Sequence, residues 1–285
     1  MIKIIKYFFQ SILIYLFFFI GLILGIRLSR AIFAYIFSII GPIFKSKKII
    51  KNNLEIFSSY SSYMDAKKIS KSMWRNYGMT FIEYIFLGQL RKSSSHITIK
   101  GENILNEIIK NKKSAIFISG HFANFELMSM ELTKRNLKLA TIYRPLNNFF
   151  LNPFMEFMRK KYICNNQIKK GINGVRDAIE YIKRDFSIAL MIDQRVSEGE
   201  KINFFGKSAL TTTLPAQLSI KYNLNIIPVY IERKKNNHFF IEFQDPISNK
   251  NYKDKIKLSK KLNKVLEKMI IKNPNQWIWT HNRWK

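Results

Sequence analysis

The chain has 285 residues and a formal net charge of +29, with 47% hydrophobic and 14% aromatic residues. This apolar fraction is enough to build a hydrophobic core, so the composition excludes a largely disordered chain. The single cysteine, Cys164, excludes an intramolecular disulfide framework and a cysteine-rich zinc site. The excess of Lys and Arg leaves three classes of partner, which are nucleic acid, an anionic membrane surface and an acidic protein or substrate.

The N-terminal segment predicts a membrane anchor. Residues 7–26 contain no charged side chain, and as a helix they span roughly 30 Å, the thickness of a bilayer core. The run is longer than the apolar part of a signal peptide and is followed by Arg27 and Arg30, not by a cleavage site, so we expect a retained transmembrane helix. Residues 31–44 are too short to span and predict an interfacial or core helix. The positive-inside bias favours a cytoplasmic location for the C-terminal part.

From residue 114 onward, short apolar runs alternate with helical patterns. Strands are predicted at 115–119, 137–142, 186–192, 225–232 and 238–243. Helices are predicted from about 124, at 150–162, at 174–184, at 211–222 and at 252–271. This alternation predicts an α/β fold whose mixed, largely parallel sheet is flanked by helices. We expect a single domain over residues 46–285, preceded by the anchor in residues 1–45.

The segment ISGHFANFELM (118–128) places a Gly–His turn between a strand and a helix. His121 and Glu126 are five residues apart, so they share no face of a continuous helix. They meet only if His121 lies in the loop and folds back over the first helical turn, which Gly120 permits. A histidine held by a carboxylate suits a general base. The alternative is a turn histidine followed by a Glu that the helix dipole favours, because the pattern is loose.

A metal site is not expected at this turn. A spacing of five residues is uncommon among metal ligands, and the sequence offers no third ligand nearby.

Several segments together resemble a known family. GHFANFE (120–126) resembles the H-x4-[DE] motif of the lysophospholipid acyltransferase superfamily, and more closely its branch of lipid A lauroyl/myristoyl acyltransferases. The other segments that resemble this branch, in chain order, are KNNLEIF (51–57), TIYRPLNN (141–148), MIDQR (191–195), FFGKSALTTTLPAQLS (204–219), NIIPVY (225–230) and QWIWTHNRWK (276–285). The resemblance covers nearly the whole chain. It departs at Ala123 and Leu214, where Gly is more usual, and neither departure removes a chemical group.

The resemblance implies transfer of an acyl chain from an acyl carrier protein thioester to a hydroxyl of a lipid A precursor, an anionic lipid. It implies that His121 takes the proton of the hydroxyl, that Glu126 orients the imidazole ring, and that no acyl-enzyme forms. It also implies a single-pass protein of the bacterial inner membrane, with its catalytic domain on the cytoplasmic side and no cofactor.

Further candidate binding residues lie at the ends of predicted strands. Arg144 is expected to bind an anion or stabilise negative charge, or else to form a structural salt bridge. Asp193, with Gln194 and Arg195 beside it, is expected to position the acceptor, or to pair structurally with Arg144 or Arg195. Lys207, in the loop after FFG, is a candidate contact for phosphate or pantetheine.

Other interpretations stay open. Cys164 has no motif around it, so we expect a passive thiol. Trp277 and Trp279 fit either a lipid-facing interface or packing that closes the domain. Another amphipathic acceptor, such as a glycerophospholipid or glycolipid, is the alternative within enzymes. A membrane-anchored basic scaffold or nucleic-acid-binding protein is the alternative class, although the aromatic residues are not interleaved with basic ones as nucleic-acid binding requires.

Overall fold

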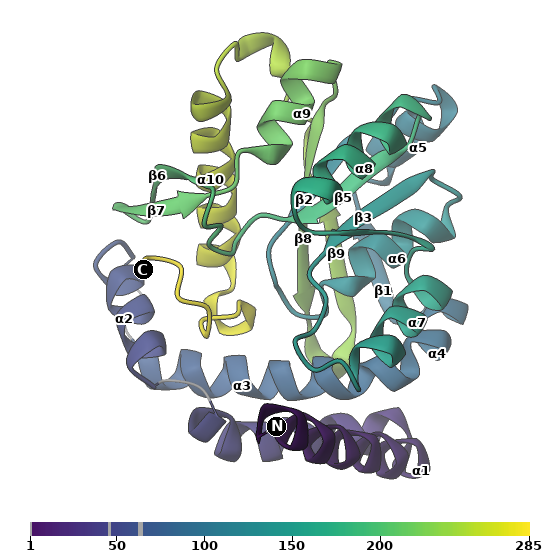
Figure 1. Ribbon diagram of the computed structural model, residues 1–285, viewed down its shortest axis with the longest axis vertical. Coiled ribbons are helices and arrows are strands. Elements are labelled where there is room, and N and C mark those ends of the chain that lie inside the picture. The colour runs from purple at the N-terminus through teal and green to yellow at the C-terminus, as the bar shows by residue number, and fades with distance from the viewer. Residues whose placement is uncertain (1, 45–46, 62–64) are drawn as a thin grey trace.

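The computed structural model describes residues 2–44, 47–61 and 65–285 (Figure 1). Its α-helices are α1 (Ile2–Phe44), α2 (Lys47–Ser58), α3 (Ala66–Glu83), α4 (Leu87–Lys92), α5 (Glu102–Lys110), α6 (Glu126–Lys134), α7 (Asn152–Tyr162), α8 (Ile172–Lys183), α9 (Leu214–Tyr222) and α10 (Lys255–Lys272). Its strands are β1 (Ile97–Lys100), β2 (Ile116–Ser119), β3 (Leu139–Tyr143), β4 (Asn166–Lys169), β5 (Ser187–Met191), β6 (Glu200–Phe204), β7 (Lys207–Thr211), β8 (Ile226–Arg233) and β9 (Phe239–Phe243).

The core of the fold is a seven-stranded sheet in the order β1-β9-β8-β2-β5-β3-β4. Neighbouring strands are parallel except for the antiparallel pair β8–β9. Strands β6 and β7 form a separate antiparallel hairpin. The predicted α/β fold with a mixed, largely parallel sheet is confirmed.

The central strands β2 and β5 are buried on both faces, as parallel strands covered by helices are. Helices α6 and α8 contact one part of the sheet, and α9 contacts β2. Because β2, β5 and β3 are parallel neighbours, their carboxyl ends open at the same edge.

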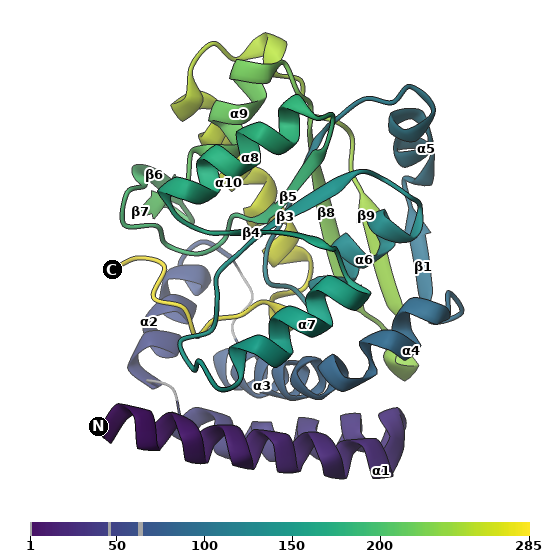
Figure 2. The same ribbon diagram turned by 45° about the vertical axis from the view of Figure 1, so that its right-hand side comes forward.

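Helix α1 is a hairpin of two helical arms. The chain reverses at Gly25, whose φ of +69° and ψ of 167° lie outside the helical region and suit glycine. Figures 1 and 2 show the two arms side by side beneath α3. A Cβ atom at Gly78 of α3 would lie 2.2 Å from the carbonyl oxygen of Phe33, so glycine allows this close approach. The two arms correspond to the predicted helix at 7–26 and the predicted segment at 31–44.

A buried charge cluster joins the second arm to the domain. Glu83, at the end of α3 and 0% exposed, accepts hydrogen bonds from Arg30 Nε at 2.5 Å and Arg233 Nη1 at 2.5 Å. Its second oxygen accepts from Asn124 Nδ2 at 2.8 Å. Burial alone would raise the pKa of Glu83, but the two guanidinium groups and Asn124 hold it below its ordinary value. The cluster therefore connects α1, α3, β8 and the segment after β2.

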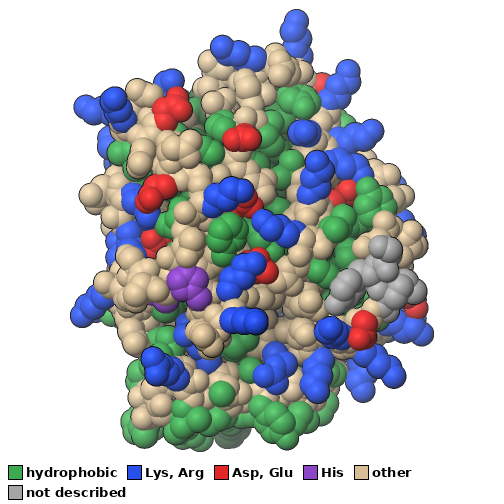
Figure 3. Space-filling model, turned by 180° about the vertical axis from the view of Figure 1, so that it is seen from behind, with side chains coloured by type: hydrophobic (Ala, Val, Ile, Leu, Met, Phe, Trp, Pro, Cys, Tyr) green, Lys and Arg blue, Asp and Glu red, His purple; other side chains and the backbone are tan. Residues whose placement is uncertain are grey.

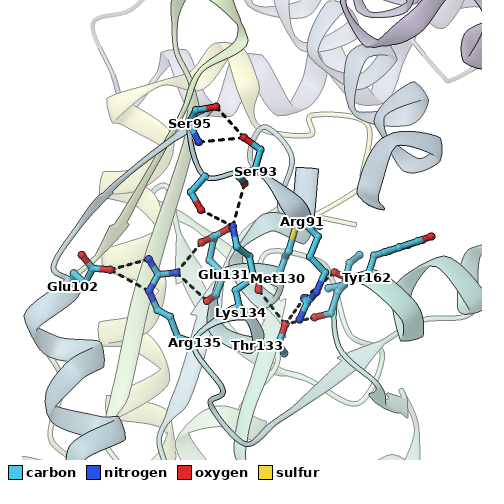
Figure 4. A network of polar contacts seen from close by, with 12 residues as sticks. Arg91, Ser93, Ser95, Glu102, Met130, Glu131, Thr133, Lys134, Arg135 and Tyr162 are labelled. Atoms are coloured by element: carbon cyan, nitrogen blue, oxygen red, sulfur yellow. Dashed lines mark hydrogen bonds and ion pairs between the residues drawn. The ribbon is translucent and has the colours of Figure 1, made fainter. Parts of the chain in front are cut away.

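A second network fixes α6 (Figure 4). Glu131 accepts hydrogen bonds from Lys134 Nζ at 2.9 Å and Arg135 Nη1 at 2.7 Å, and Arg135 Nη2 reaches Glu102 of α5 at 2.8 Å. The hydroxyl of Thr133 donates to the carbonyl of Ile163 at 2.6 Å. These contacts hold the far end of the helix that follows His121.

Candidate active site

Three segments meet at the carboxyl edge of the sheet. His121 follows β2, Asp193 follows β5, and Arg144 follows β3. These strands are parallel neighbours, and the carboxyl edge of such a sheet is where ligands bind in open α/β folds. The topology thus brings His121 and Asp193 together, although they are 72 positions apart in the sequence.

Asp193 holds His121. Its Oδ1 lies 2.7 Å from His121 Nδ1, and its Oδ2 accepts the backbone N–H of His121 at 2.7 Å. The indole N–H of Trp277 also donates to Oδ2, at 2.8 Å. Because the carboxylate accepts the Nδ1 proton, Nε2 is the ring atom free to accept another. Gln194 Nε2 lies 3.5 Å from this Nε2 atom.

Asp193 is ionised in this setting. Its side chain is 3% exposed, and burial alone would raise its pKa. The charge of His121 and the hydrogen bonds from His121 and Trp277 outweigh burial and lower the pKa to about 2. The group is therefore a fixed negative charge behind the imidazole at neutral pH.

Glu126 has a different partner from the one expected. It begins α6, and its Oε1 accepts from Arg159 Nε at 2.9 Å and Arg159 Nη2 at 2.7 Å, as well as from the hydroxyl of Tyr84. Since the Nδ1 atom of His121 is bonded to Asp193, the ring-orienting contact expected from Glu126 is made by Asp193 instead. The sheet geometry explains the difference, because β5 lies next to β2 and brings Asp193 beneath the turn.

Arg159 was not singled out from the sequence, because it is the first of three consecutive basic residues without a motif. Its guanidinium group lies at the cavity described below and contacts both Glu126 and Tyr84. Burial lowers the pKa of Arg159, but the charges of Glu126 and Tyr84 raise it above its ordinary value. Arg159 therefore supplies a permanent positive charge.

The turn from Gly120 to Phe125 is held from two sides. Ala123 has a φ of +44°, a left-handed conformation that glycine adopts more easily than alanine. Its carbonyl accepts from Thr80 Oγ1 at 2.9 Å, and its N–H donates to the Gln276 carbonyl at 3.1 Å. Helix α3 and the C-terminal segment thus fix the backbone that carries His121.

A cavity of about 500 Å³ opens beside this turn. Its titratable and amide lining includes His121, Glu126, Arg144, Arg159, Gln167, Lys170, Gln194 and His281. Apolar side chains such as Met128, Ile163 and Leu190 line another part of it. The arrangement combines an imidazole, several cationic side chains and an apolar recess in one cavity.

The remaining predicted site residues divide into two groups. Arg144 and Gln194 line the cavity, and within the described ranges Arg144 forms no ion pair with an acidic side chain. Arg195 is adjacent, and its backbone N–H points to His281 Nδ1 at 3.5 Å. Lys207 does not join them, because it lies exposed at the start of β7 and is not part of the cavity lining.

His281 is a cavity residue that the sequence did not distinguish from a structural histidine. Burial lowers its pKa to about 4, so its ring is neutral near pH 7. Its neighbours Trp277 and Trp279 are 1% and 0% exposed, so of the two interpretations of these tryptophans, packing is the correct one.

The model of the bacterial lipid A biosynthesis acyltransferase family matches residues 2–285. The chain belongs to this family. It is 23% identical over 249 residues to the lipid A biosynthesis palmitoleoyltransferase of Escherichia coli (strain K12), covering 85% of this chain and 79% of that protein. The same figures hold for a lipid A biosynthesis acyltransferase of Shigella flexneri. A second Shigella flexneri protein, lipid A biosynthesis acyltransferase 2, is 22% identical over 192 residues, which are 66% of this chain and 60% of that protein.

Family membership confirms the resemblance and makes the chain an acyltransferase of lipid A biosynthesis, acting with an acyl donor and a lipid acceptor.

The Cys164 thiol is buried, and burial raises its pKa to about 11, which suits a passive side chain. Within 2–44, 47–61 and 65–285, no three His, Cys, Asp or Glu residues group together in a way that could hold a metal ion.

Proposed function

We propose that this acyltransferase moves a fatty acyl chain from an acyl carrier protein thioester to a hydroxyl of a lipid A precursor, as a secondary acyltransferase. The observation that carries the proposal is the His121–Asp193 pair, whose free Nε2 atom faces Gln194 at the cavity. Such a pair converts an imidazole into an oriented general base.

The reaction proceeds by direct attack. The acceptor hydroxyl gives its proton to His121 Nε2 while its oxygen attacks the thioester carbonyl carbon. The resulting tetrahedral intermediate collapses, the C–S bond breaks, and the leaving thiolate takes the proton from the imidazolium. Asp193 stabilises the imidazolium between these steps, because it is a buried carboxylate bonded to Nδ1. No acyl-enzyme is needed.

Negative charge on the intermediate is stabilised by the cations of the cavity. Arg159 is held by Glu126 at 2.7 Å and therefore needs little reorganisation to meet an oxyanion. Glu126 thus acts by positioning Arg159, and Asp193 by positioning His121. Arg144, which is exposed at the cavity and has no acidic partner among the described residues, is assigned to an anionic group of donor or acceptor.

The proposed partners fit the charge of the chain. The donor carrier is acidic and the acceptor bears phosphates, whereas the chain carries +29. Lys170 also lines the cavity, and burial and the neighbouring Arg144 lower its pKa. We place the protein at the cytoplasmic face of the bacterial inner membrane, on the basis of its apolar N-terminal helix and flanking basic residues.

The test is acyl transfer by the purified full-length protein, with an acyl carrier protein thioester and a lipid A precursor as substrates. His121→Ala should lower the rate by about 10²–10⁴-fold. His238→Ala is the matched control. That histidine contacts Thr98 of the edge strand β1 and does not line the cavity. Full activity of His121→Ala would overturn the mechanism.

The acceptor is tested in parallel. Replacing the lipid A precursor with a lysoglycerophospholipid should abolish product. Mass spectrometry should show that lipid A from a host strain without the gene has one acyl chain fewer than lipid A from a strain with it. An unchanged lipid A and an altered glycerophospholipid would instead favour the other amphipathic acceptor.

A further inference from the structure

The α1 hairpin exposes an apolar face along both arms. On the first arm Phe9 is 64% exposed, Phe19 61% and Ile23 70%. On the second arm Tyr35 is 63% exposed and Ile43 75%. Figure 3 shows the lower edge of the molecule, where α1 lies, as a band of hydrophobic side chains. A contiguous apolar surface of this extent marks an interaction site.

The opposite face of the first arm is fastened to the domain over its length. Near its start, Asn148 Nδ2 donates to the Tyr7 carbonyl at 2.9 Å, and Ser11 Oγ donates to Asn148 Oδ1 at 3.1 Å. Further along, the Tyr15 hydroxyl donates to the Phe150 carbonyl at 3.0 Å. Phe18 is 3% exposed because it packs on rings from α3 and α7.

The second arm is fastened as well. Arg30 is bonded to the buried Glu83, and Phe33 is 2% exposed. At Gly41 the arm approaches so closely that an added Cβ would lie 2.4 Å from the ring of Trp74. Neither arm can turn to stand upright across a bilayer without losing these contacts and exposing buried apolar and charged groups to lipid.

Basic side chains border the apolar face. Residues 2–44 contain no Asp or Glu, and Lys3, Lys6 and Arg27 are exposed or partly exposed on the hairpin. Lys71 and Arg75 are exposed on α3, the helix that packs on α1. Figure 3 shows Lys and Arg side chains just above the hydrophobic band. An apolar strip with a basic border is complementary to a leaflet with anionic headgroups.

We infer that the α1 hairpin lies flat in one anionic leaflet, with both arms parallel to the membrane surface, and does not cross the bilayer. The N-terminus, the Gly25 reversal and the catalytic domain are then all on one side. Length and hydropathy alone favour a single crossing by residues 7–26, but they do not take account of the contacts that hold both arms against the domain.

This placement gives the lipid substrate a route, a consequence that rests on the proposed function. Tyr77 and Leu146 line the cavity of His121, and the Tyr77 ring lies 5.9 Å from that of Phe37 on the hairpin. Leu146 and Phe149 are 36% and 51% exposed in the loop that Asn148 fastens to the first arm. One rim of the cavity thus borders the membrane face, so an acceptor lipid enters from the leaflet.

The topology is tested with single cysteines introduced into the full chain. Lys3→Cys marks the N-terminus, Arg27→Cys the reversal, and Lys110→Cys, exposed on α5, the catalytic domain. The native Cys164 is buried and has a raised pKa, so its labelling background is low. A membrane-impermeant maleimide is applied to spheroplasts and to inverted membrane vesicles.

A flat hairpin predicts that all three cysteines are labelled in inverted vesicles and none in spheroplasts. Labelling of Lys3→Cys on the side opposite to Lys110→Cys would establish a single crossing. Labelling of Arg27→Cys on that opposite side, with Lys3→Cys labelled on the side of Lys110→Cys, would establish two crossings. Either result overturns the inference, as does a cysteine at position 3 or 27 that is labelled from neither side before detergent is added.

A second test measures binding to vesicles of phosphatidylethanolamine and phosphatidylglycerol. The double variant Phe19→Asp/Ile23→Asp should lower the vesicle partition coefficient by about tenfold or more. Ile172→Asp is the matched control, because Ile172 is 81% exposed on α8, away from the hairpin. Equal binding of both variants would contradict the inference. His121→Ala should leave labelling and binding unchanged, so failure of the proposed reaction would leave this result intact.

Discussion

The two carboxylate oxygens of Asp193 contact the ring and the backbone of His121, each at 2.7 Å. This double contact fixes both the position of the residue and the orientation of its imidazole. Glu126, the acidic residue of the same sequence motif, instead holds Arg159. The two carboxylates therefore have separable effects, which substitution can distinguish.

Asp193→Asn should lower the rate of acyl transfer by about 10²–10⁴-fold, because an amide at this position no longer stabilises the imidazolium. The pH profile of kcat/KM should also change, since the ring loses its charged partner. Asp177→Asn, an exposed change on α8, should leave both unaffected. An Asp193→Asn enzyme with the wild-type pH profile would show that Asp193 has only a structural role.

Glu126→Gln should lower kcat by about 10²-fold without moving the pH profile, because it loosens Arg159 and leaves the His121–Asp193 pair in place. The double variant Glu126→Gln/Arg159→Met should be little slower than Arg159→Met alone, since the two residues act as one unit. Additive losses in this cycle, or a shifted pH profile in Glu126→Gln, would contradict the assignment.

The lowered pKa of Asp193 also predicts how the stability of the fold depends on pH. Its folded-state pKa of about 2 lies below the ordinary value of 3.8, so its stabilisation is present above the ordinary value and is lost as pH falls through the lower one. The difference in thermal midpoint between wild type and Asp193→Asn should therefore narrow as the pH falls from about 4 toward about 2. A difference that widens over this interval would refute the prediction.

Ala123→Gly should raise the free energy of unfolding by up to about 1 kcal/mol, because glycine adopts the positive φ of this turn without steric cost. Ala140→Gly provides the contrast, since Ala140 lies in β3, is equally buried and has no positive φ. That change should be destabilising. Thermal melts of the two variants in the same detergent would measure both effects.

Raising the salt concentration from about 50 to 300 mM should lower kcat/KM for both substrates more than kcat, because screening weakens charge-guided encounter. Initial rates at fixed detergent concentration would measure this. If kcat/KM does not change with salt concentration, the positive charge of the chain does not guide substrate docking.

The five strands predicted from sequence, β2, β3, β5, β8 and β9, are the strands with the most buried residues. The runs at 115–119 and 186–192 became β2 and β5, whose continuous apolar pattern is typical of covered parallel strands. The polar edge strands β1 and β4 and the β6–β7 hairpin were not predicted, because partial exposure removes that pattern. The helix boundaries at α7, α8 and α10 agreed with the predicted ranges within a few residues.

Most residues of the candidate site could be predicted from the sequence, but the hydrogen-bond partner of His121 could not. His121, Glu126, Arg144 and Gln194 were singled out from local patterns and line the cavity. Which carboxylate meets His121 depends on the order of strands in the sheet, and a spacing of five residues contains no information about that order. Arg159 and His281 were not distinguished because each reaches the cavity only through tertiary packing.

The Glu83 cluster also has a consequence for the order in which the protein matures on the ribosome. Glu83 meets Arg30 from 53 positions earlier, but its other guanidinium partner, Arg233, is synthesised 150 residues later. Asn124, on the His121 turn, bonds the same carboxylate. The α1 hairpin is therefore synthesised well before Arg233 completes the cluster that holds it. The His121 turn gains its contact with the Gln276 carbonyl only when translation is nearly complete.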